Sequence, residues 1–273
     1  MHCLFKMATA RQATDTSSNH DPEKPNHMII WLDQHIGKPE NCERLKRAFG
    51  SNTDPTHQTW TMLADKDYDK SIYGNTPIIT NFNGVIFLLQ PVDNENDCLR
   101  AFEENQDKHI FFITSGSMGK EAIPKIIERY RHVFTDPITD KPYVSIYIFC
   151  LRIDYHMEWI MDYLDYLQAF NNEQDLLERM TRDIAEYFIM RGERLRGGNE
   201  LQAAEQHLSW AKILWNQYDK MQQNIKTDDR QAVRETKGMK RIDALIQEVE
   251  LLRKLNDDES SNSDAEGTGH EPA

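Results

Sequence analysis

Four short apolar runs constrain the fold of this chain more than any other feature of its sequence. Each run is five to seven residues long, and they lie at Met28–Leu32, Val85–Leu89, His109–Ile113 and Val144–Cys150. Because they are apolar at successive rather than alternate positions, strands formed by them would be buried on both faces. This pattern predicts a parallel sheet that is covered by helices on both sides.

Segments with helical spacing of apolar residues separate these runs. The first is residues 41–49, where Leu45, Ala48 and Phe49 share one face. Connections between such strands are right-handed crossovers. The alternation therefore predicts an α/β fold with a doubly wound parallel five-stranded sheet and a C-terminal α-helical extension. Further helices are expected at residues 94–105, 121–134 and 154–163, and the fifth strand at residues 166–170.

Changes in composition divide the chain into segments. The first segment is polar and lacks periodicity, and the last combines acidic residues with Ser and Gly, so both are expected to be disordered. A long polar insertion interrupts the α/β pattern, and its last residues, 76–82, could form a short edge strand. The expected boundaries are 1–27 for the disordered arm, 28–172 for the α/β domain, 50–82 for its insertion, 173–222 for a helical hairpin, 230–255 for a capping or coiled-coil helix and 256–273 for the disordered acidic tail.

Charge and cysteine spacing exclude several classes of function. The formal net charge of −13 comes from 45 acidic and 32 basic side chains, so a basic face for nucleic acid is not expected. The apolar runs are far shorter than a bilayer span, and no signal peptide is evident, so we expect a cytoplasmic protein without membrane contact. The four cysteines are widely spaced, which favours free thiols. We therefore expect neither a bound metal nor another cofactor.

The α/β segment resembles a flavodoxin-like receiver domain of the kind found in response regulators. The resemblance is nearest to a divergent animal branch, best represented in rotifers, and it rests on three short segments. It implies the strand order 2-1-3-4-5, in which the first and third parallel strands are neighbours. The segments are Trp31-Leu32-Asp33, Ser115-Gly116-Ser117-Met118-Gly119 and Ser145-Ile146-Tyr147-Ile148-Phe149-Cys150.

The chain departs from a working receiver at each position that carries the chemistry. The central strand ends in Ile113-Thr114-Ser115, without the aspartate that would accept a phosphoryl group. The acidic pair that would bind Mg²⁺ is reduced to Asp33, and no lysine follows the fifth strand, which reads Ala169-Phe170-Asn171-Asn172. Aspartyl phosphotransfer is therefore not expected.

One crevice could still bind a ligand. In a doubly wound sheet, ligands bind at the carboxyl ends of the strands where the strand order reverses. Backbone N–H groups at a helix start favour an anion such as a phosphate or a nucleotide. The alternative is that Ser115 or Ser117 simply caps the helix. The ligand-binding candidates are Asp33, Thr114, Ser115, Gly116, Ser117, Gly119 and Lys120.

Two enzyme hypotheses use the same crevice. Ser115 to Gly119 differs from a nucleophile elbow only at its first position, so Ser117 could be a hydrolase nucleophile. Asp154, His156 and His207 are the acid and the histidines that it could use. A TIR-like NAD⁺ hydrolase, which shares the flavodoxin-like layer, would need Glu121 as its catalytic acid.

The helical hairpin resembles a single tetratricopeptide repeat, although a generic αα-hairpin explains the pattern equally well. Gly192 would be the small residue where the two helices cross, and Gly192, Gly197 and Gly198 are expected to break the first helix. The apolar faces of a single repeat must be covered by another element or another chain. We therefore expect this region to bind a protein partner, and self-association is left open. The partner-binding candidates are Phe188, Gly192, Ala204, Leu208, Ala211 and Trp215.

These observations favour a non-catalytic intracellular signalling or scaffold protein, in which a degenerate receiver-like domain precedes a helical interaction module. The alternative is a nucleotide- or phosphate-binding switch, or an enzyme of the NAD hydrolase or hydrolase class, that uses Asp33 and Ser115 to Lys120.

Overall fold

The computed structural model describes residues 25–38, 40–52, 60–223 and 229–263. Most of the arm expected to be disordered, and the last ten residues of the acidic tail, lie outside the described residues. The expectation for the start of the tail is wrong, because helix α8 (Asp229–Ser263) continues through residues 256–263.

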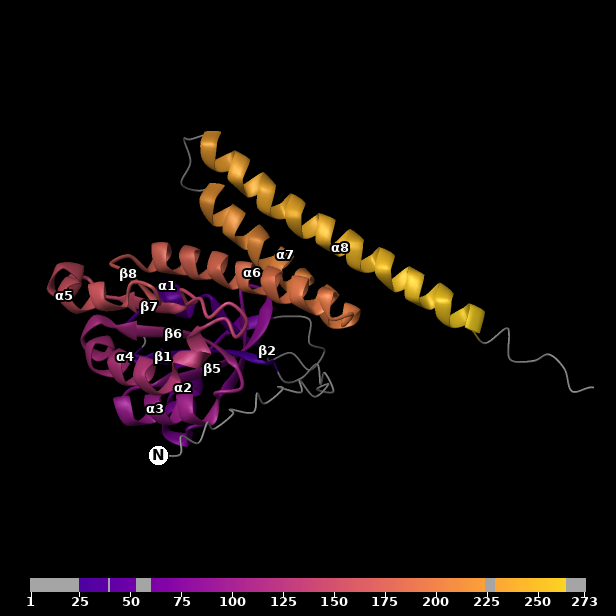
Figure 1. Cartoon of the computed structure of the whole chain (residues 1–273). Coiled ribbons are helices and arrows are strands. Elements are labelled where there is room, and N and C mark those ends of the chain that lie inside the picture. The colour runs from indigo at the N-terminus through magenta and orange to yellow at the C-terminus, as the bar shows by residue number, and fades with distance from the viewer. Residues whose placement is uncertain (1–24, 39, 53–59, 224–228, 264–273) are drawn as a thin grey trace, which may run out of the picture.

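The sheet has eight strands in the order β3-β2-β4-β5-β1-β6-β7-β8 (Figure 1). Strands β5, β1, β6, β7 and β8 pair with one another in parallel. The strands are β1 (His27–Leu32), β2 (Phe49–Asn52), β3 (Trp60–Met62), β4 (Ile78–Phe82), β5 (Val85–Val92), β6 (His109–Ser115), β7 (Ile146–Phe149) and β8 (Leu167–Phe170).

The expectation of an all-parallel five-stranded sheet is wrong, because the insertion adds three strands and makes the sheet mixed. Strand β4 pairs antiparallel with β5 through a tight turn at Asn83 and Gly84, both of which have positive φ. Strand β2 then pairs antiparallel with β4 and with β3. Strand β4 is therefore an interior strand, and the expectation of an edge strand at residues 76–82 is corrected.

Helices cover both faces of the sheet, as Figure 1 shows. Met28, Ile30 and Leu32 of β1 pack in one core with residues of α3 (Glu95–Glu104) and α4 (Gly116–Tyr130). Ile29 and Trp31 point to the other face and share a second core with α6 (Glu173–Gly197) and α7 (Leu201–Gln223). This alternation follows from the period of two along a strand.

The shorter helices differ from their expected ranges. Helix α1 is only Glu43–Lys46, because Phe49 belongs to strand β2 rather than to the helix expected at residues 41–49. The helix expected at residues 154–163 is broken into a 3₁₀ turn, the short helix α5 (Met157–Ile160) and a second 3₁₀ turn. Helix α2 (Asp65–Gly74) lies within the insertion.

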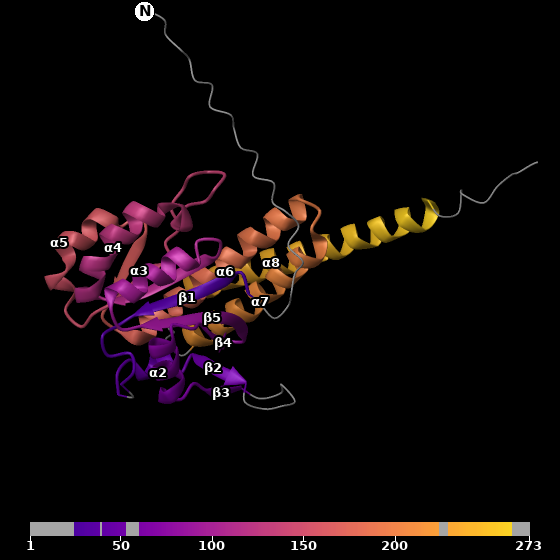
Figure 2. The same cartoon turned by 90° about the horizontal axis from the view of Figure 1, so that it is seen from below.

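The C-terminal part of the chain consists of three long helices, of which α6 packs against the sheet. The prediction that Gly192, Gly197 and Gly198 break the helix is wrong for Gly192, because α6 continues through it, but α6 does end at Gly197 with Gly198 as its C-cap. A Cβ atom on Gly192 would lie 2.7 Å from Cγ of Leu208, so this glycine allows a close crossing with α7. Helix α8 packs on α7 and extends beyond the N-terminal end of α7 (Figure 2). Within the described ranges, none of the helices has the length and apolar character needed to span a bilayer.

Candidate interaction site at the carboxyl ends of the strands

The structure brings the ends of β1 and β6 together, as the strand order 2-1-3-4-5 requires. Leu32 pairs with Thr114, so Asp33 and Ser115 occupy the next positions on neighbouring strands. The Asp33 side chain turns back on its own loop, where Oδ1 accepts a hydrogen bond of 2.7 Å from the backbone N–H of His35. Burial, together with the nearby Asp33 and Glu173 carboxylates, raises the pKa of Cys42 on the adjacent loop to about 12. The Asp33 carboxylate therefore lies close enough to act on the Cys42 thiol, which directly precedes α1.

The segment from Thr114 to Lys120 is not a loop. Strand β6 extends through Ser115, and α4 begins at Gly116. Ser115 occupies the N-cap position in an extended conformation, but its side chain makes no capping hydrogen bond. Thr114, Gly116 and Gly119 are buried, whereas Ser117 and Lys120 are exposed.

The segment between β7 and β8 packs over the start of α4. A Cβ atom on Gly116 would lie 2.7 Å from Nε2 of His156, and one on Gly119 would lie 3.3 Å from the Trp159 ring. These glycines therefore allow the two rings to approach the first turn of the helix. The rings occupy part of the space above α4 in which a bound anion would lie.

The hydrogen bonds of His156 do not fit the hydrolase hypothesis. The indole N–H of Trp159 donates to Nδ1 of His156 at 3.3 Å. Because an indole nitrogen can only donate, neutral His156 carries its proton on Nε2, the nitrogen that lies near Gly116. A catalytic base needs the opposite tautomer, with Nδ1–H held by a carboxylate.

Asp154 and His207, the other residues that Ser117 could use for catalysis, interact with other groups. The Asp154 carboxylate pairs with Arg152 at 3.0 Å. His207 lies on α7, where Nδ1 is 2.8 Å from the carbonyl oxygen of Ala203. The hydrolase hypothesis therefore has no orienting acid and no base in position. Glu121, required by the TIR-like hypothesis, is exposed on α4.

The outer side of the same segment carries both large apolar and acidic side chains, and we call the part formed by residues 151–164 the 151–164 surface. Its large side chains are between 41% and 79% exposed, while Ile160 on the inner side is 2% exposed. The segment lies beside β8, which forms one edge of the sheet. Its exposed acidic residues are Asp154, Glu158, Asp162 and Asp165. The apolar members are Leu151, Tyr155, Met157, Met161 and Leu164.

Sequence reasoning did not single out this surface. The signal was present, because residues 151–164 contain more large apolar side chains than one face of a short helix can bury. Which of them stay outside depends on the breaks on either side of α5, and the sequence pattern does not specify those breaks.

The partner-binding candidates on the hairpin are core residues. Phe188, Ala204, Leu208 and Ala211 are fully buried, and Trp215 is nearly so. Gly192 is buried against Leu208. These residues hold α6, α7 and the sheet together, so they offer no surface to a partner in this conformation.

Among the described residues, no group of three or more His, Cys, Asp or Glu side chains is placed to hold a metal ion. Comparison with protein-family models, with curated proteins and with solved structures finds no match to this chain.

Proposed function

We propose that this chain is a non-catalytic signalling scaffold, in which a doubly wound, receiver-like α/β layer binds a protein partner through the 151–164 surface. One observation carries the proposal. The segment that packs over the carboxyl ends of the strands presents five large apolar side chains to solvent. Exposed apolar patches of this kind mark interaction sites, because burying them on a partner removes apolar area from water.

The receiver-like part of the proposal rests on strand order. When the three strands of the insertion are set aside, the order β5-β1-β6-β7-β8 corresponds to 2-1-3-4-5. The strand β6, at the centre of that layer, ends in Thr114 and Ser115, where a receiver has its phosphoacceptor carboxylate. Recognition of a partner, rather than phosphotransfer, is the function that such an edge supports.

The chemistry of the surface indicates what the partner would look like. Glu158, Asp162 and Asp165 are exposed among the apolar residues, whereas Arg152 is paired with Asp154. An amphipathic segment with an apolar face and basic flanks would complement this surface. A second contact in the helical region would use the exposed Leu251, Leu252 and Leu255 of α8.

Quantitative affinity enrichment from cell extract tests the proposal. The full chain is compared with the double variant Leu151→Glu/Met161→Glu and with the control Tyr73→Glu/Ile138→Glu, which alters side chains of similar exposure elsewhere. We expect a protein that the wild type and the control retain to be depleted at least tenfold by the first variant. Equal enrichment by all three, with unchanged circular dichroism, would contradict the proposal.

The alternative, a nucleotide- or phosphate-binding switch at Asp33 and Ser115 to Lys120, has less support. The Asp33 carboxylate is hydrogen-bonded within its own loop, and His156 packs against Gly116. Saturable thermal stabilisation by NAD⁺, ATP or GTP that Lys120→Gln abolishes would favour this alternative.

A further inference from the structure

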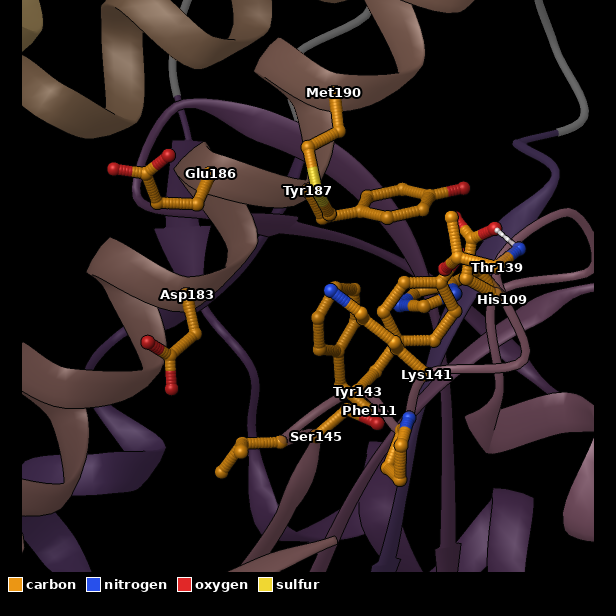
Figure 3. Close-up of a pocket in the computed structure, with 13 residues that line it drawn as sticks. His109, Phe111, Thr139, Lys141, Tyr143, Ser145, Asp183, Glu186, Tyr187 and Met190 are labelled. Carbon is orange, nitrogen blue, oxygen red and sulfur yellow. Dashed lines mark hydrogen bonds between the residues drawn. The ribbon is translucent and has the colours of Figure 1, made fainter. Parts of the chain in front are cut away.

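A cavity of about 340 Å³ lies at the opposite edge of the sheet, where β6 and β7 begin. Helix α6 forms one wall, the strand residues form the floor, and residues 136–145 close the side (Figure 3). Its volume is at the lower end of the range of small-molecule sites.

Aromatic rings form much of the lining. The rings of His109 and Tyr187 stack with centroids 3.8 Å apart and an interplanar angle of 11°. The rings of Tyr143 and Phe111 both lie edge-on to the His109 ring, with ring centroids 5.0 Å and 4.7 Å from its centroid. Burial, with smaller contributions from His27 and Arg191, lowers the pKa of His109 to about 3, so this ring is neutral at pH 7. A flat unsaturated molecule would find ring faces and edges here to pack on.

The side wall is held in place before any ligand binds. The Asp136 carboxylate accepts hydrogen bonds from the backbone N–H groups of Ile138 and Thr139, both at 2.9 Å. It also accepts hydrogen bonds from Tyr143 at 3.1 Å and from Arg194 of α6 at 2.5 Å. A preformed wall lowers the entropy cost of binding.

One buried hydroxyl in this lining has no partner. Ser145 is 1% exposed, and its Oγ atom makes no hydrogen bond. A buried hydroxyl without a partner is unfavourable, because it has lost its hydrogen bonds to water. A polar atom of a ligand could remove this cost.

Among the residues that line the cavity, the single cation, Lys141, has no ion pair in the described part of the chain. Asp136 pairs with Arg194 at 2.5 Å, and Asp183 pairs with Arg179 at 2.7 Å. Glu186 lies 3.7 Å from Arg241. Within the described part of the chain, the exposed Lys141 has no ion pair. Figure 3 shows its side chain extending toward the side on which Asp183 and Glu186 lie.

We propose that this cavity binds a small phenolic carboxylate. The ligand's ring packs among Tyr187, His109 and Tyr143. Its carboxylate pairs with Lys141 at the exposed mouth, and its hydroxyl bonds to Ser145 at the buried end. Asp136 and Asp183 have close guanidinium partners, and an amine would have to compete with those partners for them. The third acid, Glu186, has a more distant partner in Arg241, which also binds Glu193.

Calorimetric titration of the full chain tests the proposal with three probes: 4-hydroxybenzoate, benzoate and 4-hydroxybenzylamine. We expect saturable binding of 4-hydroxybenzoate. Benzoate, which lacks the hydroxyl, should bind about tenfold more weakly, which is the loss of one hydrogen bond of about 1.4 kcal/mol. The amine should bind most weakly. Absence of saturable binding, or preference for the amine, would overturn the proposal.

Variants locate the site. Lys141→Gln should weaken binding of both carboxylates, and Ser145→Ala should remove the preference for 4-hydroxybenzoate over benzoate. Lys120→Gln is the matched control, because Lys120 is also exposed but lies at the other edge of the sheet. Binding lost in Lys120→Gln and kept in Lys141→Gln would place the ligand in the carboxyl-edge crevice and overturn the assignment. Retained binding in all three variants would overturn it as well.

Discussion

Two glycines of helix α6 show how the surroundings of a residue decide its role. Gly192 lies at the crossing with α7, where an added Cβ would be 2.7 Å from Cγ of Leu208 and 3.4 Å from the backbone oxygen of Ala204. Gly197 ends the same helix, and an added Cβ there would have no atom within 4 Å. The same substitution should therefore have opposite effects at the two positions.

We expect Gly192→Ala to lower the free energy of unfolding by about 1–3 kcal/mol, because the helices must separate or Leu208 must leave its rotamer. Gly197→Ala should leave it unchanged or raise it by up to about 1 kcal/mol, through reduced entropy of the unfolded chain. Urea denaturation of both variants measures this difference. Equal effects would show that the helices do not cross closely at Gly192.

At the residue scale, the sequence predicts which strand ends lie side by side better than it predicts the contacts of individual side chains. That Asp33 and Ser115 lie at the ends of adjacent strands was expected from the strand order that the receiver resemblance implies. The turn of Asp33 toward His35 could not be predicted, nor could the ring of His156 against Gly116. Both depend on side-chain rotamers and loop geometry, which hydrophobic periodicity does not specify.

At the level of elements, the insertion shows which signals sequence patterns carry. Asn83-Gly84 is a strong hairpin signal, and it forms the turn between β4 and β5. The partner strand is hard to recognise, because Ile79 is exposed and the run Ile78–Phe82 is partly polar. Apolar runs buried on both faces were predictable, and β4 was expected as a short edge strand, whereas β2 and β3 lie where a long polar insertion was expected.

Residues 136–143 form a loop whose conformation is held by hydrogen bonds to the carboxylate of Asp136. Burial acts to raise the pKa of Asp136. The hydrogen bonds from Thr139, Ile138, Arg194 and Tyr143 outweigh that effect and hold the pKa below its ordinary value. A carboxyl group whose pKa is depressed by folding stabilises the fold above its unfolded pKa of about 3.9, and that stabilisation is lost as the pH falls through the folded value.

We expect Asp136→Asn to lower the free energy of unfolding by about 2 kcal/mol at pH 7, because the amide cannot replace the charged acceptor for Arg194. The difference from wild type should begin to shrink as the pH falls below about 4, because the carboxyl group then becomes protonated in the unfolded chain while the folded carboxylate stays ionised. Denaturation between pH 3 and pH 7 measures both effects. Asp140→Asn is the control, since this side chain in the same loop is exposed. A difference that does not change with pH would contradict this account of the loop.

At the scale of the whole molecule, the sheet and the three C-terminal helices share one hydrophobic core. That core joins Trp31 of β1, Ile184 of α6, Leu208 of α7 and Ile242 of α8. The sequence suggested a boundary at residue 172, because the alternation of short apolar runs with helical segments ends there and the residues that follow are helical. Such a change in pattern marks a change in the type of element, but it does not show whether the later helices pack on the sheet.

A shared core should make the sheet and the helices unfold together. We expect hydrogen exchange at increasing denaturant to expose the amides of β1, β6, α6 and α7 in one step. Ile242→Ala, which removes a buried side chain from α8, should lower the stability of all four elements by about 2–4 kcal/mol.

Leu252→Ala on the same helix, where the side chain is 38% exposed, should have a much smaller effect. If α6 and α7 exchange at lower denaturant than β1 and β6, the helical region is a separate folding unit. The interaction surface of the chain would then need to be sought on an independent module rather than on one continuous body.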